Sequence, residues 1–159
     1  MRTHTRQARV AGVALLASAI MLVVVPATAE EVSMEKAEQA IKYRQNVMSA
    51  MGGLLGTAVG QLREGFTFGP DLKGVAAGLK LVSSDVAALF PEGTDIGETK
   101  AKPEVWSDSE GFADKSTQAA DAAAAFAEAV DSGDKKMMLQ AFKMVGDSCK
   151  GCHEDYRAK

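Results

Sequence analysis

Residues 145–156 have the sequence Val-Gly-Asp-Ser-Cys-Lys-Gly-Cys-His-Glu-Asp-Tyr, which contains the pattern Cys-x-x-Cys-His at Cys149 to His153. This pattern is typical of covalent attachment of a c-type haem. Thiols three residues apart share one face of a helix, so both can reach the two vinyl groups on one edge of the porphyrin. The adjacent imidazole then lies where the iron needs an axial ligand. The pattern predicts one haem c, bound through Cys149 and Cys152, with His153 as the proximal ligand.

Two other uses of paired cysteines fit this sequence less well. A redox-active dithiol of the thioredoxin type needs a strand–helix–strand context, whereas the residues around Cys149 have helical periodicity. A structural zinc site needs four ligands. The chain has two cysteines and two histidines, and His4 lies in a segment that we expect to be removed. A zinc site would therefore also need a carboxylate, such as that of Glu154 or Asp155.

Residues 1–29 have the composition of a secretory signal peptide. Three arginines near the start precede an apolar run at residues 10–25, and Ala-Thr-Ala at residues 27–29 is a small-residue cleavage site. A retained membrane anchor is the alternative, but the run is shorter than the ~20 apolar residues that span a bilayer. We therefore expect cleavage after Ala29, a periplasmic location, and a mature domain of residues 30–159 with no membrane segment.

The composition of residues 30–159 agrees with one small exported domain. The segment is long enough to bury a single hydrophobic core. Loss of the leader arginines leaves 15 of the 18 basic residues against 21 acidic ones, a net charge near −6. An acidic surface disfavours nucleic acid and anionic lipid as partners. Haem attachment to cysteines is completed outside the cytoplasm, so the leader and the Cys-x-x-Cys-His pattern agree.

Four segments have apolar residues at three- and four-residue steps, which is typical of amphipathic helices. Ser33 and Asp134 suit the N-caps of the first and the fourth. Pro70 suits the start of the second, which we expect to end before Pro91, and Gly133 suits the end of the third. A short helical turn is also expected at residues 103–106. The predicted helices are residues 34–62, 70–90, 109–132 and 135–156. Short connections between most of them imply an all-α fold, an antiparallel four-helix bundle with the cofactor between helices.

Gly52, Gly53 and Gly56 lie close together inside the first predicted helix. Each lowers helix stability by about 1 kcal/mol relative to alanine. We expect a neighbouring helix or a flat ligand to approach the backbone closely at these positions. A break in the helix is the alternative explanation.

Together these features resemble the class II cytochromes c, the cytochrome c′ family. The resemblance covers nearly all of residues 30–159. It implies a bundle with the haem near one end, covered on its distal side by the first helix. It also implies that Arg44 lies near a haem propionate and that Arg157 packs close to the imidazole of His153. The residues alone also allow a solvated arginine at position 44 and an ordinary basic residue at a helix C-terminus at position 157. The most specific segments are residues 41–45, 102–107 and 145–157.

The ligand on the other side of the iron decides between two functions. The mature chain has one histidine, which excludes bis-histidine ligation within a monomer. A methionine thioether would give low-spin iron and a higher reduction potential. The resemblance places Met48 at the family's distal position, with Met51 one turn further along as the other candidate. Methionines at helical spacing also commonly fill gaps in a core. We expect Met48 to ligate the iron.

The expected function is single-electron transfer by a periplasmic c-type cytochrome with redox proteins as partners. The alternative is a five-coordinate, high-spin cytochrome c′ whose iron binds nitric oxide or carbon monoxide. We do not expect an enzyme, because a peroxidase would need a distal histidine as acid–base partner and the chain offers none. The resemblance further implies a homodimer that pairs through the first two helices, although no exposed stripe in the sequence requires it.

Overall fold

The computed structural model describes residues 32–159; the predicted leader, residues 1–29, lies outside them. The described chain forms five α-helices and a 3₁₀ turn. None of these helices is long and apolar enough to cross a membrane. The elements are α1 (Met34–Leu62), α2 (Leu72–Val82), η1 (Ala87–Leu89), α3 (Glu104–Ser107), α4 (Ser109–Ser132) and α5 (Lys135–Tyr156).

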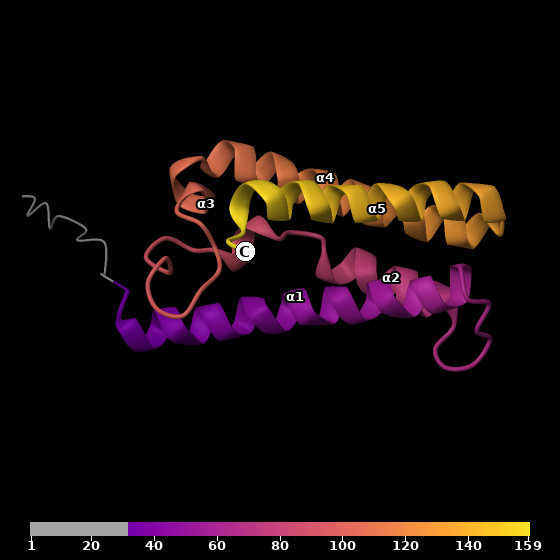
Figure 1. Ribbon diagram of the computed structural model, residues 1–159, viewed down its shortest axis with the longest axis horizontal. Helices are drawn as coiled ribbons and strands as arrows, with labels where there is room; N and C mark the ends of the chain where they lie inside the picture. The colour runs from indigo at the N-terminus through magenta and orange to yellow at the C-terminus, as the bar shows by residue number, and fades with distance from the viewer. Residues whose placement is uncertain (1–31) are drawn as a thin grey trace, which may run out of the picture. The chain divides into compact units, whose positions relative to one another are not determined.

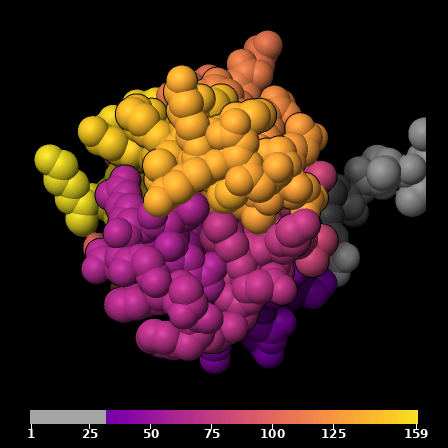
Figure 2. Space-filling model, turned by 90° about the vertical axis from the view of Figure 1, so that its right-hand side faces the viewer, coloured from indigo at the N-terminus to yellow at the C-terminus, as the bar shows by residue number. Residues whose placement is uncertain are grey.

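The four longer helices run antiparallel to one another in chain order (Figure 1). α4 packs along α5, and α2 packs against both α1 and α4. The predicted all-α four-helix bundle is therefore confirmed, and α3 is the predicted short turn. The long connection between η1 and α4 folds at one end of the bundle. Figure 2 shows the other end, where residues of α1 and α2 lie against residues of α4 and α5.

Apolar side chains from all four long helices form one core. Leu79 of α2 and Phe126 of α4 are almost completely buried. The ring of Phe126 lies 5.4 Å from that of Phe142 on α5, measured between centroids. Small buried residues of α4, such as Ala122 and Ala123, leave room for close packing against the neighbouring helices. The apolar periodicity of the sequence thus corresponds to the buried faces.

Most helix ends lie where the capping residues predict them. The Ser33 hydroxyl accepts a hydrogen bond from the N–H of Lys36 at the start of α1. The Asp134 carboxylate accepts hydrogen bonds from two N–H groups of the first turn of α5. Gly133 ends α4 in the left-handed region at φ 73°, a conformation that favours glycine. These three predicted ends are confirmed.

The second helix is shorter than predicted. It begins after Asp71, not at Pro70, and ends at Val82, eight residues before Phe90. Ser83 follows, buried, with its hydroxyl donating to a side chain of α1. Asp85 then accepts from the N–H of Ala88 at the start of η1. Serine and aspartate side chains compete with the helix for backbone groups. The chain through η1 buries apolar side chains on the same side as α2, so the apolar spacing continues past Val82. Periodicity alone therefore did not reveal that the helix ends there.

The glycines of α1 do not have the expected role. α1 is continuous through Gly52, Gly53 and Gly56, so the helix does not break there. All three are exposed, and a β-carbon at any of them would have no neighbour within 4 Å. None lines the pocket described below. The predicted close approach of a helix or flat ligand at these glycines is therefore wrong for the described part of the chain.

Candidate haem-binding site

A pocket of about 760 Å³ lies between α1, α5 and the chain from Phe90 to Phe112. This volume falls in the range of ~300–1,000 Å³ that is usual for ligand and cofactor sites. Phe90, Val105 and Phe112 give it an apolar wall, with Tyr156 of α5 next to them. Phe112 packs edge-on against both Phe90 and Tyr156, at 5.0 and 5.1 Å between ring centroids. The pocket therefore has a rigid aromatic side.

Both cysteines of α5 are half-buried free thiols. Cys152 lines the pocket, and Cys149, one turn earlier on the same face, packs against the hydrophobic core. Burial raises the pKa of both thiols above the ordinary value. This burial favours the neutral thiol form, and the two sulfurs are not joined in a disulfide.

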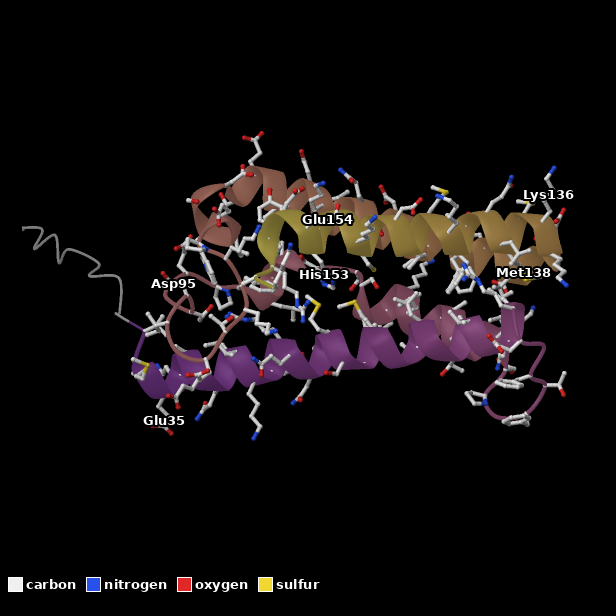
Figure 3. All side chains as sticks on the ribbon, viewed as in Figure 1. Glu35, Asp95, Lys136, Met138, His153 and Glu154 are labelled. Atoms are coloured by element: carbon white, nitrogen blue, oxygen red, sulfur yellow. The ribbon has the colours of Figure 1, made fainter. Side chains whose placement is uncertain are left out.

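His153 lies on the side of α5 that faces α1 (Figure 3) and lines the pocket. Desolvation lowers the pKa of the imidazole, and the nearby charge of Arg157 lowers it further. The neutral imidazole is the form that binds a metal. Arg157 forms the C-cap of α5, where its N–H donates to the carbonyl of His153 at 3.2 Å, and it also lines the pocket.

Met48 is half-buried and lines the pocket from α1, the wall opposite α5. It is the one methionine of the described residues that does so. Met51, the other ligand candidate, is buried in the core, where its sulfur accepts a hydrogen bond from the Ser83 hydroxyl at 3.5 Å. The structure thus places Met48, and not Met51, in the pocket that contains His153.

Arg44 is buried with only 2% of its surface exposed, so the solvated arginine that the sequence also allowed is not observed. Its guanidinium donates to the hydroxyl and carbonyl of Thr94 and to the hydroxyl of Thr99, all at 2.9 Å. It also lies 4.8 Å from the ring centroid of Phe90 and 5.6 Å from that of Trp106. Desolvation lowers the pKa of this guanidinium.

No carboxylate of the described residues forms an ion pair with Arg44. A buried cation without a counter-charge is costly, because the low-dielectric interior replaces water. Arg44 also lines the pocket, so an anionic group bound there would supply the missing charge. A flat apolar macrocycle that carries carboxylates and is fixed by thiols and an imidazole fits this set of residues.

Several residues of the site carry no signal in the sequence. Thr94 and Thr99, which bind Arg44, lie in the longest irregular stretch, where no periodicity assigns a direction to side chains. Gln45 donates to the carbonyl of Glu98 at 3.3 Å and closes part of the gap between α1 and that stretch. These partners depend on the path of the loop, and only the three-dimensional structure shows that path.

A family model for cytochrome C′ matches residues 39–157, about three quarters of the chain. The chain belongs to the cytochrome c′ family. The resemblance seen in the sequence is confirmed. Cytochromes c′ carry one covalently bound haem c, so the predicted cofactor is also confirmed.

Proteins named cytochrome c′ and proteins named cytochrome c-554 are both similar to this chain over almost their whole length. Cytochrome c′ of Pararhodospirillum photometricum is 32% identical over 121 residues, which cover 76% of this chain and 97% of that protein. Cytochrome c-554 of Cereibacter sphaeroides is 32% identical over 149 residues, which cover 91% of this chain and 95% of that protein.

Solved structures of cytochrome c prime from Alcaligenes xylosoxidans have the same fold. A nitric oxide complex of one variant superposes with a TM-score of 0.70 at 34% identity, covering 77% of this chain and 97% of that one. A carbon monoxide complex of another variant has a TM-score of 0.71 at 34% identity and covers 80% and 100% of the two chains. Proteins similar to this one therefore bind diatomic gases.

Proposed function

We propose that this cytochrome c′ is a periplasmic haem protein whose iron, held by His153, binds nitric oxide or carbon monoxide on the side facing α1. The observation that carries the proposal is the nitric oxide and carbon monoxide complexes of proteins with the same fold and 34% identity. The pocket supports it in one respect, because His153 lines the wall that α5 contributes and could hold the iron there. No substrate conversion is part of the proposal.

The proposal gives each side chain of the pocket a role. Cys149 and Cys152 would form thioethers with the haem, and His153 would ligate its iron. When bound, the haem supplies a redox-active iron that takes up a small ligand. Arg44 would pair with a propionate. Its guanidinium has five N–H donors, of which the threonines of the loop take three, so two remain for an anion. Arg157 would pack beside the imidazole and keep it neutral.

A location in the periplasm is supported by the leader-like composition of residues 1–29 and by the chemistry of haem attachment. The partners in this proposal are small gases. A homodimer through α1 and α2 belongs to the proposal as an expectation from the family resemblance.

Electron transfer with Met48 as sixth ligand is the second candidate. The observation that favours it is the position of Met48, since no other methionine of the described residues lines the pocket. A thioether opposite an imidazole stabilises low-spin iron and raises the reduction potential. In that case the distal position would be occupied and redox proteins would be the partners.

Visible spectra of the ferrous holoprotein, with and without carbon monoxide, separate the two functions. We expect a high-spin, five-coordinate spectrum that changes on addition of carbon monoxide and is the same in Met48→Leu. A low-spin spectrum in the wild type that becomes high-spin only in Met48→Leu would overturn the proposal in favour of the second candidate. Met51→Leu is the matched control, because its side chain lies in the core, and it leaves the spectrum unchanged under both hypotheses.

A further inference from the structure

Lys102 caps most of the backbone carbonyls at the C-terminal end of α5. The last four carbonyls of a helix have no partner within the helix. In α5 the carbonyl of His153 accepts from the N–H of Arg157 at 3.2 Å. Lys102 supplies the other three bonds. Its ammonium donates to the carbonyls of Glu154 and Asp155 at 3.0 and 2.8 Å, and its N–H donates to the carbonyl of Tyr156 at 3.0 Å.

The ammonium of Lys102 is directed at the helix end and not at the neighbouring acidic side chains. The carboxylate of Asp155 pairs with Lys115 at 3.0 Å, and that of Glu154 pairs with Lys150 at 3.6 Å. The C-terminus of a helix carries a partial negative charge from its aligned peptide groups. A lysine that binds two carbonyls there neutralises this charge within one turn of His153.

The loop that carries Lys102 is itself firmly held, and it lies beside the C-terminus of the chain (Figure 1). Ala101 pairs with Arg157 in an antiparallel bridge, and the N–H of Ala158 donates to the carbonyl of Lys100 at 2.8 Å. Two residues before Ala101, Thr99 is bonded to Arg44 of α1. The position of Lys102 is therefore set by the backbone and does not depend on a flexible side chain alone.

We propose that Lys102 is a positioning residue for the proximal haem ligand: it holds the last turn of α5, and with it His153, and adds a positive charge on that side of the pocket. The inference rests on the proposed role of His153 as the iron ligand. A nearby positive charge favours the ferrous over the more positive ferric iron, because it repels the ferric state more strongly. Lys102 thereby raises the reduction potential of the haem.

The test compares Lys102→Met with the wild-type holoprotein in two measurements, the midpoint potential and the hydrogen exchange of the amides of residues 153–157. We expect a lower midpoint potential and exchange about tenfold faster, since a charge-assisted bond to the helix end is lost. Lys102→Arg retains charge and donors and should restore both values. Lys136→Met is the matched control, because it removes the same charge at the opposite end of α5 (Figure 3) and should leave both unchanged.

A wild-type potential in Lys102→Met, or an equal shift in Lys136→Met, would overturn the inference. If Lys102→Met fails to fold, Lys102→Gln replaces it. This variant keeps a donor for the carbonyls but loses the charge, so we expect near-normal exchange with a lowered potential; an unchanged potential contradicts the inference. Failure of the underlying proposal is recognised separately, because an iron ligand other than His153 would already appear in the spectrum of the wild-type protein.

Discussion

Arg44 connects the first helix to the irregular chain that covers the pocket. A planar guanidinium can donate in several directions and stack on aromatic rings at the same time, which an ammonium cannot do. Arg44 uses both properties, since it binds Thr94 and Thr99 at its edge and lies against Phe90 and Trp106 with its face. One buried residue thereby determines where several residues of the loop lie.

Replacement of Arg44 by alanine should lower the free energy of unfolding by about 2–4 kcal/mol, because it leaves a cavity and unpaired threonine groups in the interior. Arg44→Lys should recover only part of this loss, since lysine lacks the fork of donors. Denaturant unfolding of the holoprotein measures the effect. The control is Arg63→Ala at the exposed C-cap of α1, where we expect a change within about 0.5 kcal/mol. An equally small change for Arg44→Ala would contradict the prediction.

The sequence predicted the residues of the site that belong to a motif, and not those that depend on the loop. Cys149, Cys152 and His153 follow from their spacing on one helix. Met48 and Arg44 came from the family resemblance, and the structure places both in the pocket. Lys102 appeared only as part of a family segment. Its bonds to the end of α5 span more than fifty residues of chain, and no local pattern contains that information.

At the scale of the helices, the start of α4 and the end of α5 meet at one carboxylate. Asp108 caps α4 by accepting from the N–H of Gly111 at 3.3 Å and also accepts from the hydroxyl of Tyr156 at 2.7 Å. A β-carbon at Gly111 would lie 2.5 Å from the Asp108 carboxylate and 2.6 Å from the Tyr156 oxygen. The absence of a side chain at position 111 is therefore a condition for the contact between these two helix ends.

Gly111→Ala should destabilise the protein by about 1–2 kcal/mol, although alanine is the better helix former, because the new methyl group must displace the bond between Asp108 and Tyr156. Gly146→Ala is the control in α5. That position is exposed and has no neighbour within 4 Å, so the same substitution should be stabilising. Thermal unfolding measures both variants. A midpoint for Gly111→Ala at or above that of the wild type would show that the contact is dispensable.

At the scale of the whole molecule, the spacing of apolar residues was sufficient to predict the four-helix bundle. It was not sufficient to predict the irregular chain between the helices. Amphipathic spacing identifies which face of each long helix is buried, and short connections leave few ways to arrange four such helices. The error at the end of α2 shows the limit. The apolar spacing continues past Val82, while the serine and aspartate residues that follow end the helix. The C-terminal end of α2 is therefore set by polar side chains that compete with the helix for backbone hydrogen bonds.

The stability of the folded chain should depend on alkaline pH through Tyr156. Its hydrogen bond to the Asp108 carboxylate, with desolvation as a further cause, raises the pKa of the Tyr156 hydroxyl from 10.0 to about 12. The unfolded chain therefore loses this proton at lower pH than the folded chain does. The resulting stability is complete below pH 10 and is lost as the pH rises toward about 12.

Unfolding free energies measured from pH 8 to pH 12 should thus fall more steeply for the wild type than for Tyr156→Phe, which lacks the titrating group. Tyr43→Phe is the matched control, because Tyr43 is exposed on α1, and it should retain the wild-type slope. If the free energy of unfolding falls equally steeply with pH in the wild type and in Tyr156→Phe, groups other than Tyr156 cause the loss of stability at alkaline pH.

The three exposed glycines of α1 lie one to two turns beyond Met48, outside the pocket itself. Each glycine makes the helical state of α1 about 1 kcal/mol less favourable than alanine would, in a class of domains whose total stability is only about 5–15 kcal/mol. Gly52 follows Met48 by one turn, and within the described part of the chain no atom packs where a β-carbon would lie at these glycines. The α5 wall, by contrast, has every terminal carbonyl bonded. The end of α5 that carries His153 therefore has little freedom to fray, whereas the stretch of α1 just after Met48 opens at a lower cost in free energy than an alanine-containing helix would.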